Sequence, residues 1–71
     1  MNTKEFRKQL KEATDIPHVV FYRGPFCFDV SIRKQYRVEM REILKQFNCA
    51  DLTEYGDSNS DFCIFCVRVG V

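Results

Sequence analysis

The run Phe62–Val69 constrains the fold of this 71-residue chain more than any other segment. It reads FCIFCVRV, and an apolar run of this length, rich in aromatic and β-branched side chains, predicts a buried β-strand. Successive side chains of a strand point to opposite faces, and here both faces are apolar. One face would carry Phe62, Ile64 and Cys66, and the other Cys63, Phe65, Val67 and Val69. A sheet that contains this strand therefore exposes an apolar surface wherever helices cover only one of its faces.

The N-terminal segment predicts an amphipathic helix over residues 4–13. Asn2 or Thr3 can cap it, and Glu5 is placed for a capping box if Asn2 is the cap. A narrow apolar stripe at helical spacing is formed by Phe6, Leu10 and Ala13. Pro17 ends this segment, because the residue before a proline is pushed out of the helical region.

Residues 18–23 and 26–32 predict two strands of a β-hairpin joined by Gly24 and Pro25, since glycine suits the first position of a type II′ turn. This two-residue loop would oppose Tyr22 with Cys27, Phe21 with Phe28, Val20 with Asp29 and His18 with Ser31. One face would then carry Val19, Phe21, Phe26, Phe28 and Val30. The other would carry His18, Val20, Tyr22, Cys27, Asp29 and Ser31. The apolar faces of the two strands coincide in this register.

Ser31 is predicted to cap a second helix that runs to about Phe47. Its core face would consist of Tyr36, Met40, Ile43, Leu44 and Phe47. A weak strand around residues 50–55 and a polar turn precede the strong strand Phe62–Val69. The predicted element order is therefore α-β-β-α-β-β.

This order predicts an α+β fold, a two-layer sandwich with two helices on one face of a three- or four-stranded antiparallel sheet. It is the order of a ferredoxin-like βαββαβ domain whose first strand has been moved to the end. The chain has no Pro/Gly/Ser-rich linker and no internal repeat, so residues 1–71 are expected to form one small domain.

The charges are nearly balanced in total but unevenly distributed. Eleven Lys and Arg stand against ten Asp and Glu, a formal net charge of +1, which does not indicate strong polyanion binding. Residues 1–48 hold ten basic and six acidic side chains. Residues 49–71 hold four acidic side chains and one basic side chain, Arg68. No apolar stretch approaches the roughly 18 residues of a membrane span, and a cytoplasmic location is expected. Cysteines there usually remain free thiols.

Neither a metal site nor a catalytic site is predicted. Cys63 and Cys66 form a CxxC pair, but in a strand two residues three positions apart point to opposite faces. The hairpin register would group His18, Ser31 and Asp29, the residue types of a hydrolase triad. No nucleophile elbow or glycine-rich oxyanion loop accompanies them, so no enzymatic activity and no cofactor are expected.

A basic ridge is predicted along the second helix, since Arg33, Arg37, Arg41 and Lys45 recur at intervals of four with Lys34 beside them. Such a ridge can bind an acidic protein surface or a phosphate backbone. A solvated helix face is the alternative interpretation. The open side of the sheet is expected to add Val20, Tyr22 and Cys27 to an apolar patch that favours a homodimer or a partner interface.

These features predict a small, non-enzymatic protein-binding modulator with an acidic protein surface as its partner. By analogy of size and character, it could be an inhibitor of host defence of the anti-CRISPR or anti-restriction type that phages and bacteria encode. The alternative is a small nucleic-acid-binding module that uses the basic ridge. The predicted partner-binding residues are Arg33, Lys34, Arg37, Arg41, Lys45, Val20 and Tyr22.

Overall fold

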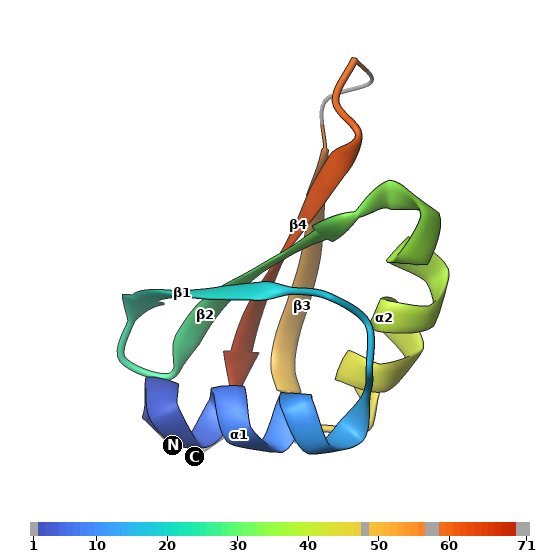
Figure 1. The fold of residues 1–71 in the computed structure, drawn as a ribbon. Helices are drawn as coiled ribbons and strands as arrows, with labels where there is room; N and C mark the ends of the chain where they lie inside the picture. The colour runs from blue at the N-terminus through green and yellow to red at the C-terminus, as the bar shows by residue number, and fades with distance from the viewer. Residues whose placement is uncertain (1, 48, 57–58, 70–71) are drawn as a thin grey trace.

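The computed structural model describes residues 2–47, 49–56 and 59–69 and has two helices and four strands there. In chain order the elements are α1 (Thr3–Ala13), β1 (Val19–Gly24), β2 (Cys27–Arg33), the short 3-10 helix η1 (Lys34–Tyr36), α2 (Arg37–Lys45), β3 (Cys49–Gly56) and β4 (Phe62–Val69) (Figure 1). The predicted α+β class and the element order are confirmed, including the strand expected around residues 50–55. Asp57 and Ser58 of the predicted polar turn lie outside the described residues.

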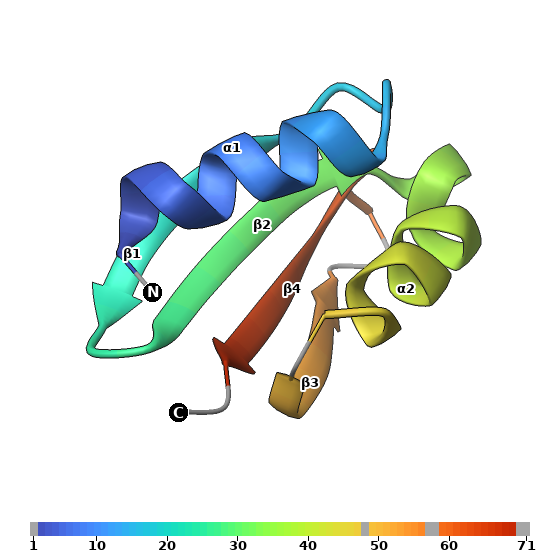
Figure 2. The same ribbon diagram turned by 90° about the horizontal axis from the view of Figure 1, so that it is seen from below.

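The four strands form one sheet in the order β1-β2-β4-β3, and each neighbouring pair is antiparallel. The doubly apolar strand β4 lies in the interior of the sheet, where both of its edges are hydrogen-bonded. The connection through α2 carries the chain from β2 past β4 to the edge strand β3. Helix α1 runs along β1 and β2, whereas α2 lies beside β3 and β4 (Figure 2).

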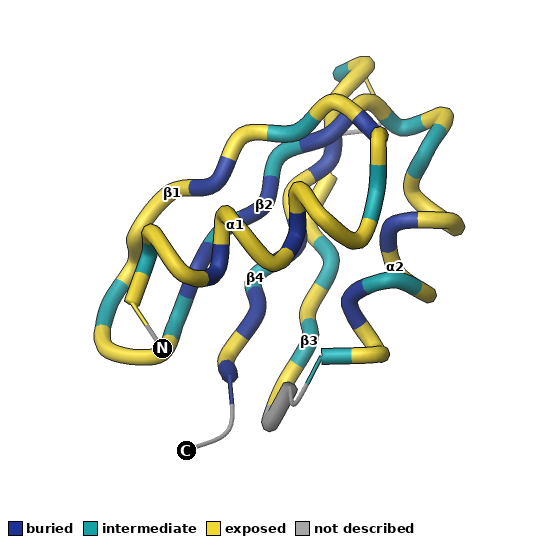
Figure 3. Tube along the Cα trace, turned by 60° about the horizontal axis from the view of Figure 1, so that its bottom comes forward, coloured by how far each residue is buried: buried dark blue, intermediate teal, exposed yellow. Residues whose placement is uncertain are grey.

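The core is a single cluster of buried apolar side chains. They come from both helices, from the strands β1, β2 and β4, and from Ile16 between α1 and β1. The Phe6 ring stacks on the Phe28 ring with centroids 4.6 Å apart, and Phe47 packs edge-on against Phe6. We call the sheet face that joins this cluster the covered face and the opposite one the open face. The covered face carries Val20, Phe28, Val30, Ile32, Cys63, Phe65, Val67 and Val69. Figure 3 draws the buried positions of the chain in dark blue.

Helix α1 begins as the sequence predicts. Asn2 is its N-cap, and the Asn2 side chain accepts a hydrogen bond of 2.8 Å from the backbone N–H of Glu5. Arg7 donates a hydrogen bond of 2.7 Å to the backbone carbonyl of Val20 in the edge strand β1. Phe6 and Leu10 enter the core, so one side of α1 is fixed to the sheet by packing and by this hydrogen bond.

The predicted hairpin register is wrong by one residue. Val20 pairs with Val30 and Tyr22 with Phe28, and an irregularity between Tyr22 and Gly24 shifts the register before the turn. Pro25 and Phe26 form the turn, and the positive φ of 62° falls on Phe26 instead of Gly24. Because an extra residue reverses which side chains share a face, Val19 and Phe21 lie on the open face and Val20 is buried.

The predicted start of the second helix is also wrong. Ser31, the expected cap, lies within β2, and Arg33 is the last residue of that strand. The alternation of Phe28, Val30 and Ile32 continues the strand, because these side chains complete the covered face beside β4. Helix α2 starts only at Arg37 and ends at Lys45, two residues before the expected end. Met40 and Leu44 nevertheless enter the core as predicted.

Candidate binding surface

The open face of the sheet carries an apolar surface that crosses all four strands. One row runs from Val19 through Ser31 and Ile64 to Tyr55, as the strand pairings place these residues opposite one another. Large hydrophobic side chains of this face are 38–54% exposed. They are Val19, Phe21, Tyr55, Phe62 and Ile64, which we call the open-face patch. The predicted apolar open face is therefore present, with Phe62 and Ile64 of β4 on it.

The two open-face residues predicted from β1 are placed differently. Val20 is 2% exposed and belongs to the core, so its predicted place on the open face is wrong. Tyr22 is 64% exposed, but it pairs with Phe28 and therefore lies on the covered-face side of the edge strand. Their neighbours Val19 and Phe21 occupy the open face instead, because the strand register is shifted by one residue.

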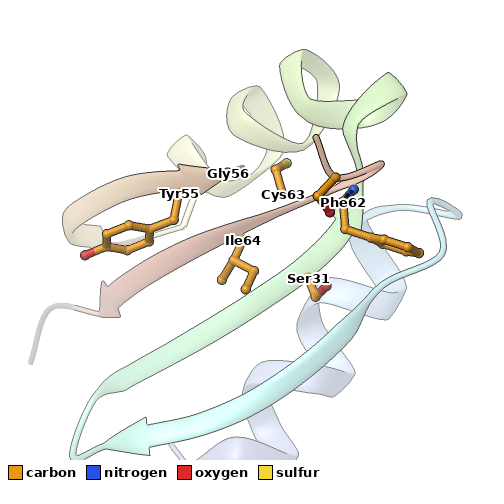
Figure 4. A pocket seen from close by; sticks show the side chains of 7 residues that line it. Ser31, Tyr55, Gly56, Phe62, Cys63 and Ile64 are labelled. Carbon is orange, nitrogen blue, oxygen red and sulfur yellow. Dashed lines mark hydrogen bonds between the residues drawn. The ribbon is translucent and has the colours of Figure 1, made fainter. Parts of the chain in front are cut away.

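A pocket of about 460 Å³ opens within the open-face patch. Tyr55 and Phe62 stand on opposite sides of Ile64, and Ser31 lies beside Ile64 on β2 (Figure 4). The Ser60 hydroxyl accepts a hydrogen bond of 3.1 Å from the backbone N–H of Phe62. The residues that line the pocket are Ser31, Tyr55, Gly56, Ser60, Phe62, Cys63 and Ile64. Apolar walls with a few hydroxyl groups suit an apolar side chain or ring.

Positive charge adjoins this pocket at the end of β2. The Arg33 guanidinium carbon lies 5.3 Å from the centroid of the Phe62 ring, a cation–π arrangement. The backbone N–H of Lys34 donates to the Asp61 carbonyl at 2.9 Å, which ties η1 to the segment before β4. A second, smaller pocket of about 310 Å³, lined by the basic residues Lys34 and Arg37 and by Glu54, shares Gly56 and Cys63 with the first. We call Arg33, Lys34 and Arg37 the basic end.

The predicted basic ridge is divided between elements and partly paired. Arg33 and Lys34 precede α2, so only its last three members lie on the helix. Arg37 and Arg41 both form ion pairs with Glu54 of β3, the first at 3.5 Å. Lys45 pairs with Glu42 at 3.3 Å on the helix surface. Glu54 therefore joins α2 to β3 and offsets part of the positive charge of the ridge.

A pair of thiols lies on the open face on the two central strands, near the turn that joins β1 to β2. The Sγ atoms of Cys27 and Cys66 are 3.6 Å apart, and both side chains are half-buried. Asp29, which pairs across the strands with Cys66, accepts a hydrogen bond of 3.0 Å from Arg23. Burial, the adjacent Cys27 thiol and the Asp29 carboxylate raise the pKa of Cys66 to about 11. Reasoning from sequence missed this contact, because only the β2–β4 register brings the two cysteines together.

The CxxC residues are separated as predicted. Cys63 points to the covered face and is buried, which raises the pKa of its thiol, whereas Cys66 lies on the open face. Among the described residues, no group of three or more His, Cys, Asp or Glu side chains is arranged to hold a metal ion.

The grouping of His18, Ser31 and Asp29 does not form. Ser31 pairs with Val19 instead of His18, as the corrected register requires. His18 Nδ1 lies 2.7 Å from the Ile16 carbonyl oxygen, and Asp29 is paired with Arg23.

In the described part of the chain, no helix is long and apolar enough to cross a membrane.

Comparison with protein families, with curated proteins and with solved structures finds no match for this chain. Functional inference therefore rests on the open-face patch, its pocket and the charges around them.

Proposed function

We propose that this chain is a non-enzymatic protein-binding domain that docks its partner on the open face of the sheet. The partner would place an apolar side chain in the pocket between Tyr55 and Phe62 and acidic residues against the basic end. The observation that carries this proposal is the open-face patch, in which five large hydrophobic side chains on one face are each 38–54% exposed.

The size of the patch fits the centre of a protein interface. An aromatic side chain can bury about 150–250 Å², and Phe21, Tyr55 and Phe62 are each about half exposed. Together with Val19 and Ile64, they present roughly 400–500 Å² of apolar surface, comparable to the largest patches on monomeric proteins. A standard interface buries about 800 Å² on each partner, with an apolar centre and a polar rim.

The charges beside the pocket favour an acidic partner segment. Arg33 holds its guanidinium over Phe62, where a carboxylate of the partner can reach it from above the pocket. Arg37 is 58% exposed in its side chain despite its pairing with Glu54. Arg41 and Lys45 are engaged with Glu54 and Glu42, so we assign them a smaller part in partner binding than the sequence suggests.

The test uses a capped Asp-Phe-Asp peptide titrated into isotope-labelled protein and followed by NMR. We expect saturable shifts of the backbone amides of Ser31, Phe62 and Ile64. A capped Asp-Ala-Asp peptide should bind at least about tenfold more weakly, because burial of a large apolar side chain is worth about 1.5–3 kcal/mol. A capped Asn-Phe-Asn peptide should also bind more weakly, because it lacks the charges that meet the basic end.

Matched variants locate the site. Ile64→Asp places a carboxylate in the pocket and should abolish the shifts. Val38→Asp makes the same kind of change at an exposed position of α2 and should leave them unchanged. Equal binding of the Phe and Ala peptides, or shifts that survive Ile64→Asp, would contradict docking in this pocket.

A second copy of the chain is another possible occupant of the patch. Sedimentation of the wild-type protein over a range of micromolar concentrations distinguishes a homodimer from a monomer. A dimer that dissociates in Ile64→Asp but not in Val38→Asp would replace the partner protein with a homodimer. If the protein is a monomer at all concentrations, the occupant of the open face is a different protein.

Single-stranded nucleic acid is the second candidate function. The observation that favours it is the set of three exposed aromatic rings, Phe21, Tyr55 and Phe62, on the same face as Arg33. Bases can stack on such rings for about 1–3 kcal/mol each. Because Glu54 pairs with two arginines of the ridge, we expect weak and strongly salt-dependent binding to an oligothymidylate. Submicromolar affinity at about 0.15 M salt, lost in Phe62→Ala, would favour this function over protein binding.

Within the protein-binding class, we retain an inhibitor of host defence of the anti-CRISPR or anti-restriction type. Such an inhibitor needs a docking surface and no catalytic site, which fits a domain of this size. It is tested by adding the protein to purified restriction or CRISPR nucleases and measuring DNA cleavage, with Ile64→Asp as the inactive control. A cytoplasmic location fits the free thiols of Cys27, Cys63 and Cys66.

We also infer that the fold is a two-layer, permuted ferredoxin-like sandwich with both helices on the covered face. Moving the first ferredoxin-like strand to the end and renumbering the strands reproduces the order β1-β2-β4-β3. Phe6 and Leu10 of α1 belong to the same core cluster as Met40 and Leu44 of α2, which supports a common face for the two helices.

A further inference from the structure

The thiol pair of Cys27 and Cys66 is a site that the proposed docking function does not use. The two residues lie on adjacent strands, Cys27 at the start of β2 and Cys66 within β4. Cys27 pairs with Arg68 and Cys66 with Asp29, so the cysteines are diagonal neighbours on the same face. Their Sγ atoms are 3.6 Å apart, whereas Cys63 points to the other face and is buried.

A disulfide bond is within reach of this arrangement. Bonded sulfur atoms are about 2.05 Å apart, so the two Sγ atoms must approach by about 1.5 Å. Rotation about the Cα–Cβ bonds supplies part of this movement. Diagonal neighbours in a sheet have Cα atoms about 7–8 Å apart, beyond the roughly 4.4–6.8 Å usual for a disulfide, so the backbone of β2 must also move. Cys27 is the first residue of β2, directly after the turn, so the movement falls at the end of the strand.

We propose that Cys27 and Cys66 are a reversible modification site at which a small-molecule disulfide, such as oxidised glutathione, converts the two thiols to an intramolecular disulfide. The Cys27 thiolate attacks one sulfur of oxidised glutathione, whose disulfide bond breaks and releases one glutathione thiolate. The Cys66 thiolate then attacks the Cys27 sulfur of the mixed disulfide and releases the second glutathione. The two protein thiols lose two electrons and two protons, and one glutathione disulfide becomes two glutathione thiols.

The environment of Cys66 limits how readily its thiol ionises. Burial, the Cys27 thiol and the Asp29 carboxylate raise the pKa of Cys66, so its thiolate is scarce near neutral pH. Attack by Cys66 first, followed by closure by Cys27, gives the same disulfide and the same two glutathione thiols, because the two Sγ atoms are 3.6 Å apart. Because the bond has to pull two diagonal positions together, reduced glutathione should reopen it readily.

The experiment treats the reduced full-length protein with oxidised glutathione, stops the reaction with acid and measures the intact mass. We expect a monomer that has lost two hydrogen atoms, about 2 Da. Trypsin leaves Cys63 and Cys66 in one peptide, so chymotrypsin is used, which cuts after Phe62 and Phe65 and separates them. The linked peptides should contain Cys27 and Cys66, and reduced glutathione should restore the original mass.

Two variants serve as matched tests. Cys27→Ser should no longer lose two hydrogen atoms, whereas Cys63→Ser should still form the bond. Asp29→Asn removes the carboxylate beside Cys66 and should close the ring faster than the wild type at neutral pH. Linkage through Cys63, exclusively intermolecular disulfides, or a mixed disulfide that never closes would overturn the proposal. None of these outcomes depends on whether the open face binds a partner.

Discussion

Replacing Phe28 by Leu and, separately, Phe21 by Leu tests the strand register that defines the open face. The structure places Phe28 in the core at 1% exposure, stacked on Phe6 with ring centroids 4.6 Å apart. It places Phe21 on the open face at 54% exposure. The register expected from the sequence would put both rings on one face and give both substitutions a similar cost.

The expected losses in the free energy of unfolding differ severalfold between the two variants. Phe28→Leu loses the aromatic pair, about 0.5–1.5 kcal/mol, and leaves a small cavity worth about 1 kcal/mol. The free energy of unfolding should therefore fall by about 1.5–2.5 kcal/mol, whereas Phe21→Leu should change it by less than about 0.5 kcal/mol. The total free energy of unfolding of a domain of this length is about 4–11 kcal/mol, so both variants should remain folded.

Urea titration and thermal unfolding, followed by circular dichroism, measure the two changes. A domain of this size loses about 4–8 °C in Tm per kcal/mol, which predicts a fall of about 6–20 °C for Phe28→Leu. Equal losses for the two variants, or a larger loss for Phe21→Leu, would refute the observed register and with it the composition of the open-face patch.

Three further predictions concern the helix cap, the ion pairs and the thiol pair. Asn2→Ala should lower the free energy of unfolding by about 1 kcal/mol in urea titrations, since it removes the N-cap of α1, and Asn2→Asp should retain it. Glu54→Gln should cost about 0.5–1 kcal/mol at low salt and less at about 1 M salt, because the ion pairs with Arg37 and Arg41 are partly exposed; a salt-independent loss would contradict this. The native state keeps the Cys66 proton up to about pH 11, whereas the unfolded chain loses it above about pH 9.0. The stability contributed by this thiol is thus complete below pH 9.0 and lost as the pH rises towards 11, so Cys66→Ser should flatten the decline in Tm over that range.

Two of the five residues of the open-face patch follow from a pattern that the sequence displays locally. The alternation in Phe62–Val69 predicts that one of two apolar sets must lie away from the helices, and Phe62 and Ile64 do so. The basic residues at intervals of four are equally visible, but their neighbours are not. Glu54 is far from Arg37 and Arg41 in the sequence, and only the pairing of β3 beside α2 makes it their partner.

The sequence by itself determined the order of the helices and strands and the start of α1, because hydrophobic periodicity and the Asn2 cap act within a few residues. Tertiary structure alone decided the register of β1 against β2, the end of β2 and the contact between Cys27 and Cys66. A strand has a side-chain period of two, so one extra residue before the turn reverses its faces. Local turn preferences favour Gly24 and Pro25 as the turn, whereas burial of Val20, Phe28 and Val30 against both helices and β4 stabilises the other register. The face of each side chain in this hairpin therefore depends on the strand pairing, which the local turn residues do not specify.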